Sequence, residues 1–340
     1  MGIDRRATAA GFAAAFAVLA VLVAVVGVGD LASALRQAQL LVLPAVLVAA
    51  IIWVTSWGVA LGVVCRALGV AVSIPQVVVV YVGALFANNV TPLGQAGGEP
   101  ITAFLVSSVG DTEYETGLAA IASADTVNFV PSTVFAVVGF AYLSVAVTLG
   151  PRLRLAAGMI AAAAVVVPVV AAVLWWHRRR VEAAVARVTV PVARAVGANV
   201  PRVRVPTKAG IEARIGGFFQ SLEVVARDRR TLAAAVGLSA LGWFAQMLSL
   251  WLSLYALGVT APLAAVFVAV PVGAFAGVTV LPGGLGGVEA VLVVLLVPTV
   301  GISAATALAA VLVHRTATYW LPMLLGGAVV TTLGVDAVAS

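Results

Sequence analysis

The sequence predicts an all-α polytopic membrane protein, built as an inverted repeat with two re-entrant helical hairpins that are each broken at a Gly/Pro turn. Three observations support this fold class: the composition, the lengths of the apolar runs, and one motif that recurs at a constant spacing. Of the 340 residues, 63% are hydrophobic and 9% are charged, and the mean hydropathy is +1.17. Soluble domains carry about 25% charged residues. This chain is therefore expected to bury its apolar surface in a bilayer.

The composition also excludes several kinds of site. A single cysteine, Cys65, excludes an intrachain disulfide, and two distant histidines, His177 and His314, exclude a multi-histidine metal centre. The only lysine is Lys208, so neither glycine-rich segment has the Lys-Ser/Thr of a nucleotide-binding P-loop. We therefore expect no metal, no cofactor and no ATP-driven step in this chain.

The apolar runs predict six spans, because crossing about 30 Å of hydrocarbon takes about 20 helical residues. The first run follows Asp4-Arg5-Arg6 and precedes Ala32-Ser33-Ala34, the order of a secretory signal. It is long for a signal segment, and we interpret it as a retained span. The predicted spans are 10–29, 39–65, 117–149, 153–176, 231–257 and 302–335.

Two further apolar stretches are interrupted by Gly/Pro-rich turns and predict the hairpins. Ile74–Val90 and Ile101–Val109 flank the first turn, and Leu263–Val280 and Val288–Val297 flank the second. Each second arm has about 10 residues, which gives roughly 15 Å of helix and is too short to span. Non-helical backbone at membrane depth is tolerated only where it is buried in protein or lines a wet cavity. The hairpins, 74–109 and 262–297, are therefore expected to surround a site.

The two hairpins are repeats of one another at an offset of 190 residues. Their shared positions are Val82-Gly83-Ala84 with Val272-Gly273-Ala274, Pro92 with Pro282, Gly94 with Gly284, Gly97 with Gly287, and Glu99 with Glu289. Trp53 and Trp243, and Asp125 and Arg315, have the same offset. Such a run of matches predicts an internal duplication, and counting the spans between the copies predicts that the halves have opposite orientation.

The charge distribution divides the chain and orients it. Twelve of the 19 basic residues lie between Arg178 and Arg230, which predicts a cytoplasmic loop at 177–230 with amphipathic helices and both termini on the same side. The resulting organisation is a first membrane repeat at 1–150, a span at 151–176, the basic loop, and a second membrane repeat at 231–340.

Ionisable residues inside the apolar segments are the strongest functional candidates, because each costs about 2.5–3.5 kcal/mol at a helix centre. Asp125 and Arg315 occupy equivalent positions, so we expect them to form an ion pair, and we expect Glu99 and Glu289 to face each other across the repeat axis. Glu99-Pro100 is expected to begin a helix. The candidate substrate- or ion-binding residues are Asn88, Asn89, Pro92, Gly97, Gly98, Glu99, Asp125, Pro282, Gly283, Gly284, Gly286, Glu289, Arg315 and Tyr319.

In these motifs the chain resembles the lysylphosphatidylglycerol synthase transmembrane, flippase-like family. The resemblance rests on Asn89-Val90-Thr91-Pro92, Gly97-Gly98-Glu99-Pro100, the segment Leu281–Glu289, and Arg315 with Tyr319-Trp320-Leu321-Pro322. It implies a membrane domain that moves lipids with polar or charged headgroups between leaflets. The soluble aminoacyl-transferase domain of the bifunctional members is expected to be absent from this chain.

These observations predict a non-enzymatic lipid flippase in the cytoplasmic membrane. Its partners would be membrane lipids with anionic or lipid-linked headgroups rather than nucleic acid, with a second copy of the chain or a lipid-synthesis enzyme as candidate protein partners. Two alternatives stay open: an intramembrane lipid-modifying enzyme that uses the paired carboxylates, and a non-catalytic scaffold for a lipid synthase.

Overall fold

The computed structural model describes residues 5–91, 95–146, 173, 176–177, 180, 220, 223–277 and 281–332. Within these ranges every regular element is helical and no strand occurs. Six helical stretches are long and apolar enough to cross a bilayer: Thr8–Val26, Leu40–Ala67, Tyr114–Val145, Arg229–Ala256, Pro282–Gly301 and Ala304–Thr332. The prediction of an all-α polytopic membrane protein is confirmed.

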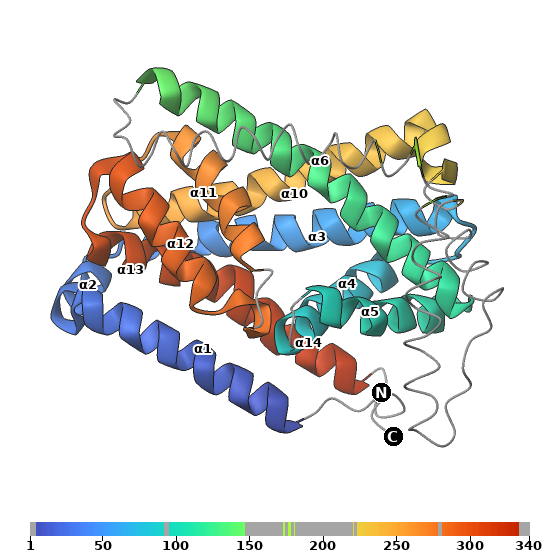
Figure 1. The fold of residues 1–340 in the computed structure, drawn as a ribbon, viewed down its shortest axis with the longest axis horizontal. Helices are drawn as coiled ribbons and strands as arrows, with labels where there is room; N and C mark the ends of the chain where they lie inside the picture. Colours follow the sequence, from blue (N-terminus) through green and yellow to red (C-terminus); the bar gives the residue numbers. More distant parts are fainter. Residues whose placement is uncertain are drawn as a thin grey trace.

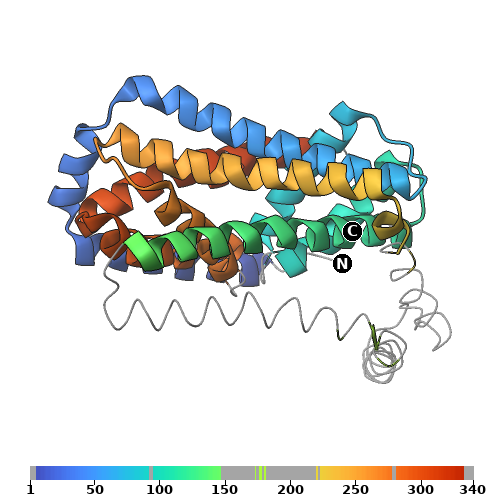
Figure 2. The same ribbon diagram turned by 90° about the horizontal axis from the view of Figure 1, so that it is seen from above.

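Two long helices, α3 (Leu43–Ala67) and α10 (Arg229–Ala256), pack on each other. They run side by side along the long axis of the molecule (Figures 1 and 2). Gly242 allows the close approach, because a Cβ there would overlap the Trp57 ring. Trp57 then packs edge-to-face on Trp243, with ring centroids 5.2 Å apart. The two helices are therefore joined by aromatic packing as well as by their close approach at Gly242.

The start of α10 is set by Asp228, which lies just outside the apolar part of the helix. Its carboxylate accepts hydrogen bonds from the Arg230 backbone N–H at 3.0 Å and from the Thr231 hydroxyl at 2.6 Å. Both bonds hold the pKa of Asp228 below its ordinary value, and the bond from Thr231 has the larger effect. Asp228 is thus a helix N-cap, a role in which an aspartate satisfies backbone donors that have no partner within the helix.

Four shorter helices pair around the two Gly/Pro-rich segments: α4 (Ile74–Val90) with α5 (Gln95–Val109), and α11 (Leu263–Ala276) with α12 (Gly287–Leu296). The pairs lie toward opposite ends of the long axis (Figure 1). At about 1.5 Å per residue each of these helices is shorter than the roughly 30 Å hydrocarbon core. Only with its flanking turns does α12 form a membrane-length stretch. The re-entrant course of the hairpins and the opposite orientation of the halves remain predictions.

The first hairpin differs from its prediction, because α5 begins at Gln95 rather than at the Glu99-Pro100 step. The prediction was wrong because the two glycines were interpreted as a break in the helix. Gly98 is instead helical and packs on α4, where a Cβ would overlap Asn88. Glycine in a membrane helix is often a site of close helix contact. Pro100 is the sixth residue of α5 and lies inside the helix, where it lacks the N–H that would bond to the preceding turn.

The second turn is built on glycines in left-handed conformations. It comprises the 3₁₀ turn η2 (Pro282–Gly284) and the two residues that precede α12. Gly283, Gly284 and Gly286 have φ values of 54°, 65° and 86°, a region that costs other residues about 1–2 kcal/mol. The N-terminal helix α1 (Arg5–Val26) lies across this turn, with Ala15 buried against Leu285 and Tyr319. The glycine-rich turn is therefore covered by protein, as the sequence predicted for non-helical backbone.

The remaining helices complete the bundle. Helix α2 (Val28–Arg36) packs on α13 (Ala304–Arg315), and α6 (Tyr114–Ala146) packs on α10 on the side away from α3 (Figure 2). The last predicted span, 302–335, is not one continuous α-helix, because a π-helical turn (Thr316–Trp320) separates α13 from α14 (Leu321–Thr332). Such turns occur often at functional sites, and this one follows Arg315 directly.

Two predicted regions lie largely outside the described residues. They are the span 153–176 and the basic loop 177–230. The cytoplasmic placement of that loop and of both termini remains a prediction.

Candidate functional site

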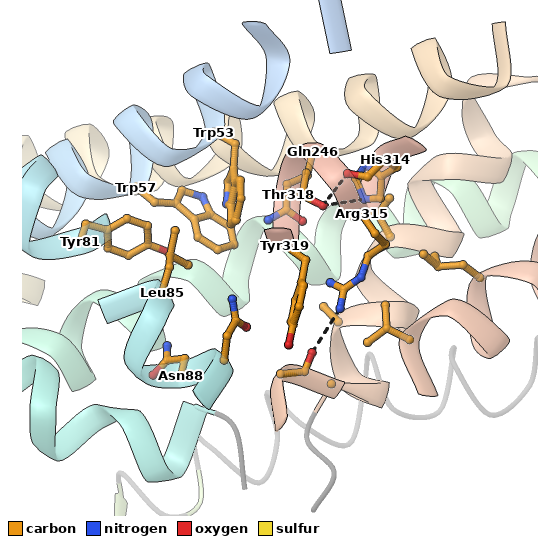
Figure 3. Close-up of a pocket in the computed structure, with 17 residues that line it drawn as sticks. Trp53, Trp57, Tyr81, Leu85, Asn88, Gln246, His314, Arg315, Thr318 and Tyr319 are labelled. Carbon is orange, nitrogen blue, oxygen red and sulfur yellow. Dashed lines mark hydrogen bonds between the residues drawn. The ribbon is translucent and has the colours of Figure 1, made fainter. Parts of the chain in front are cut away.

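A cavity of about 210 Å³ lies where α3, α4 and α10 meet the second hairpin and the π turn. Its walls combine aromatic, amide and charged side chains inside segments that are otherwise apolar (Figure 3). The aromatic residues are Trp53, Trp57, Tyr81 and Tyr319, and the polar ones are Asn88, Asn89, Gln246, His314, Arg315 and Thr318. A polar cavity in membrane-spanning helices is the arrangement expected of a binding site rather than of a lipid-facing surface.

The charged centre of the site is an ion pair between Arg315 and Glu289. Arg315 Nε donates to Glu289 Oε1 at 2.6 Å, and the side chains are 12% and 1% exposed. The other carboxylate oxygen, Oε2, accepts the backbone N–H of Gly286 at 2.6 Å. Glu289 therefore has two roles, because it neutralises Arg315 and also satisfies a donor at the N-terminus of α12.

Arg315 is held in place by two further contacts. Its guanidinium donates through Nη2 to the carbonyl of Gly283 at 3.3 Å, and its Cζ lies 4.4 Å from the centre of the Tyr319 ring. Tyr319 in turn donates its hydroxyl to the carbonyl of Pro282 at 3.4 Å. Arginine stacks on aromatic faces and bonds to oxygen in a fixed plane. The turn η2, α12 and the π turn thus jointly fix the orientation of one cation.

His314 occupies the same wall and is buried. Its Nδ1 lies 3.0 Å from the hydroxyl of Ser249 on α10, and its backbone carbonyl accepts the Thr318 hydroxyl at 2.9 Å. Ser249 itself is fully buried and does not line the cavity. We interpret the contact as one that positions α13 against α10, because a Ser–His pair acting on a ligand would need the serine at the cavity surface.

The structure brings many of the predicted site residues together. Asn88, Asn89, Gly283, Arg315 and Tyr319 line the cavity. Pro282, Gly284, Gly286 and Glu289 belong to the turn and helix that contact Arg315. Gly97, Gly98 and Glu99 lie on α5 and Asp125 lies on α6. Of these, Gly98, Glu99 and Asp125 are not among the described residues that line the cavity. Pro92 is outside the described residues.

The predicted ion pair between Asp125 and Arg315 is wrong, since Arg315 pairs with Glu289. Equivalence in a duplicated chain places two residues at corresponding positions, but they touch only when both lie at the repeat axis. The predicted approach of Glu99 to Glu289 finds no support among the described contacts either. Glu289 has Arg315 as its partner, and Glu99 is half-buried on α5.

Most residues that line the cavity did not enter the sequence-based candidates, and the aromatic and polar ones among them are Trp53, Trp57, Tyr81, Gln246, His314 and Thr318. Two of these residues have a feature in the sequence that could have identified them. Trp53 recurs as Trp243 at the repeat offset, and Gln246 is a polar amide in the middle of an apolar span. Within the described ranges, no group of three His, Cys, Asp or Glu residues is arranged to hold a metal ion.

The turn itself yields a test, because Gly283 is confined by more than its backbone conformation. A Cβ at Gly283 would lie 2.5 Å from both Asn89 Oδ1 and Tyr319 Cε2, whereas Gly301 has a similar left-handed φ of 77° with no atom within 4 Å. Gly301→Ala is expected to cost about 1–2 kcal/mol for the conformation alone. Gly283→Ala should cost at least about 1 kcal/mol more for overpacking. Unfolding free energies in mixed detergent micelles measure the difference, and equal losses would contradict the contacts described for Gly283.

Comparison with known proteins identifies relatives along nearly the whole chain. The family described as the lysylphosphatidylglycerol synthase TM region matches residues 9–326. A UPF0104 membrane protein of Methanothermobacter thermautotrophicus is 28% identical over 336 residues, covering 95% of this chain and 92% of the relative. A UPF0104 membrane protein of Pyrococcus horikoshii is 24% identical over 287 residues, covering 83% of each chain. The protein therefore belongs to the lysylphosphatidylglycerol synthase transmembrane-region family.

Proposed function

We propose that this protein is a lipid flippase that moves polar or anionic headgroups between leaflets through the cavity around Glu289 and Arg315. The observation that carries the proposal is the buried ion pair at the wall of a cavity inside membrane-length helices. A charge at the bilayer centre costs at least about 2.5 kcal/mol, and such residues usually mark a substrate or ion pathway. Membership of a family named for a lipid synthase supports a lipid as the substrate.

Arg315 has the capacity to bind an anionic headgroup in addition to Glu289. A guanidinium carries five N–H donors, and two hydrogen bonds to described residues engage Arg315, those to Glu289 and Gly283. Three donors are left for a ligand, and Arg315 lines the cavity. Because arginine binds phosphate through two parallel hydrogen bonds, the phosphate of a phospholipid or of a polyprenyl-phosphate-linked lipid is the proposed ligand.

The size of the cavity indicates which part of the lipid enters. Pockets that enclose whole drug-sized ligands measure roughly 300–1,000 Å³, and this cavity measures about 210 Å³. It accommodates a headgroup but not the acyl chains, which would stay in the surrounding lipid. That division is what a flippase requires, since only the polar headgroup must be shielded from the hydrocarbon.

The driving force would come from the lipid gradient, from a coupled ion or from the membrane potential. The potential is worth about 2.3 kcal/mol per charge per 100 mV. Glu289 would exchange its contact with Arg315 for a proton or cation as the headgroup binds. Glu99 on α5 would bind or relay the same proton or cation. The protein is proposed to leave the lipid chemically unchanged.

The test measures the movement of two lipids between the leaflets of proteoliposomes. The lipids are phosphatidylglycerol and polyprenyl phosphate, each with a fluorescent label on its hydrocarbon chain, and a chemical quencher removes the fluorescence of the outer leaflet. Glu289→Gln should slow transfer by about tenfold or more, because it removes a charge-assisted hydrogen bond to Arg315. The matched control is Glu223→Gln, which alters a pair of the same length, 2.6 Å to Arg227, on an exposed surface. That variant should move lipid at the wild-type rate.

Three results would count against the proposal. Chemically altered lipid in the wild-type vesicles would favour the intramembrane enzyme. Folded wild-type protein that moves no lipid would favour the scaffold for a lipid synthase. Equal rates for wild type and Glu289→Gln would remove the ion pair from the transport pathway.

A further inference from the structure

We propose that the cavity selects lipids whose headgroup is a ring polyol, such as an inositol or a sugar, joined to the lipid through a phosphate. The hydroxyl groups would bond to three amide side chains, the ring would pack in an aromatic corner, and the phosphate would meet Arg315. This inference rests on the proposed function and specifies its substrate class.

The first observation concerns the amides Asn88 and Asn89 at the end of α4 and Gln246 on α10. All three line the cavity. None of their side chains forms a hydrogen bond with another described residue, and Asn88 Oδ1 is buried without a partner. An amide removed from water without a hydrogen bond is costly. Each amide offers donors and an acceptor, although Asn88 Oδ1 packs on Gly98 of α5. A ligand rich in hydroxyl groups, which also donate and accept, would therefore bond to Asn89 and Gln246 through both kinds of group and to Asn88 through its N–H groups.

The second observation is the aromatic corner formed by Trp53, Trp57 and Tyr81. The Trp53 and Trp57 rings lie 5.7 Å apart at 77°, and the Trp57 and Tyr81 rings lie 6.4 Å apart at 81°. Trp57 Nε1 is engaged by the carbonyl of Ser239 at 3.1 Å, so its contribution to the cavity is ring carbon. Trp53 Nε1 is buried with no hydrogen-bond partner and the residue is 4% exposed. The corner therefore offers flat apolar faces for ring C–H groups.

The third observation is the charge of the lining. Among the described residues that line the cavity, none is a carboxylate, and Arg315 has Glu289 as its counter-ion. An aromatic corner alone could also take a quaternary ammonium group. A choline, however, has no donor or hydroxyl for the three amides, which would stay unsatisfied on binding. The neutral polyol fits the amides and the aromatic faces together.

The positions of these groups match a headgroup with a ring at one end and a phosphate at the other. In Figure 3 the aromatic corner and Asn88 lie on one side of the cavity and Arg315 lies on the other, with Gln246 and Tyr319 between them. A ring in the corner thus leaves its phosphate directed at the three guanidinium donors of Arg315. A site with one side for the ring and the other for the phosphate differs from an anion site formed by Arg315 alone.

The experiment compares phosphatidylinositol with phosphatidylcholine of the same acyl chains, which share the diacylglycerol phosphate and differ in the headgroup alcohol. Binding to the detergent-solubilised protein is measured by native mass spectrometry, and transfer is measured in proteoliposomes. Wild type should bind and move the inositol lipid at least about tenfold better. Gln246→Leu should reduce that preference, whereas the same change at the exposed Gln37, which follows α2, should not.

The outcomes separate this inference from the transport function. Equal or stronger binding of the choline lipid to wild type would overturn the polyol inference and make the aromatic corner a cation site. An inositol preference that survives in folded Gln246→Leu and Asn88→Leu would overturn the role of the amides. An inositol preference in binding, with no lipid moved, would support the polyol site and overturn the flippase proposal. The wild-type comparison alone decides the first point if the variants fail to fold.

Discussion

Arg315→Met is expected to destabilise the protein by about 3–5 kcal/mol, the cost of removing one partner from a buried ion pair. Glu289 would stay 1% exposed with its charge uncompensated, and only the Gly286 N–H would still bond to it. Arg227→Met is the matched control, because its bond to Glu223 is also 2.6 Å long but the side chains are 78% and 34% exposed. Exposed pairs contribute about 0–1 kcal/mol. Unfolding free energies in mixed micelles measure both losses.

The double variant Glu289→Met/Arg315→Met separates stability from function. Replacing both members of a buried pair with apolar groups is often neutral or stabilising. A stable double variant that moves no lipid would show that the pair serves transport. Similar losses for Arg315→Met and Arg227→Met would contradict the burial and pairing described for the site.

Arg315→Lys is expected to slow lipid transfer by about 10–100-fold with a smaller loss of stability. Lysine keeps the positive charge, but its ammonium is a point charge that lacks the planar fork of arginine. It cannot bond to Glu289, reach the Gly283 carbonyl, stack on Tyr319 and bind phosphate through two parallel bonds at once. Losing one or two charged hydrogen bonds, at about 1.5 kcal/mol or more each, accounts for the range.

The measurement for Arg315→Lys is the transfer rate in proteoliposomes at matched protein content. Arg227→Lys on the exposed pair is the control and should match wild type. A fully active Arg315→Lys variant would contradict a geometric role for the guanidinium, because charge alone would then suffice.

Much of the fold could be predicted from the sequence because bilayer insertion depends on composition and run length. The turn at Pro282–Gly284 was also predictable, since left-handed glycines leave a recognisable pattern. The start of α5 was not, because glycine serves both as a helix breaker and as a contact point between helices. Which role Gly98 has depends on its position against Asn88, and that is set by tertiary packing.

The candidate site shows the same division. The ionisable residues were identified from their cost in the bilayer, and Glu289 and Arg315 do lie together. Their pairing could not be derived, because helices of nearly uniform apolarity do not reveal which face turns inward. The same limit explains why Gln246 and the aromatic corner were missed. Their role depends on the rotation of α3 and α10 about their axes, which only the packed structure fixes.

The central claim is that a lipid headgroup enters the cavity, and site-specific photocrosslinking tests it most directly. A diazirine analogue of leucine would replace Leu85, which lines the cavity, and separately Leu324, which is 72% exposed on α14. After irradiation in lipid vesicles, mass spectrometry locates the adduct on the lipid. We predict headgroup adducts at Leu85 and acyl-chain adducts at Leu324. Acyl-chain adducts alone at both positions would contradict the claim.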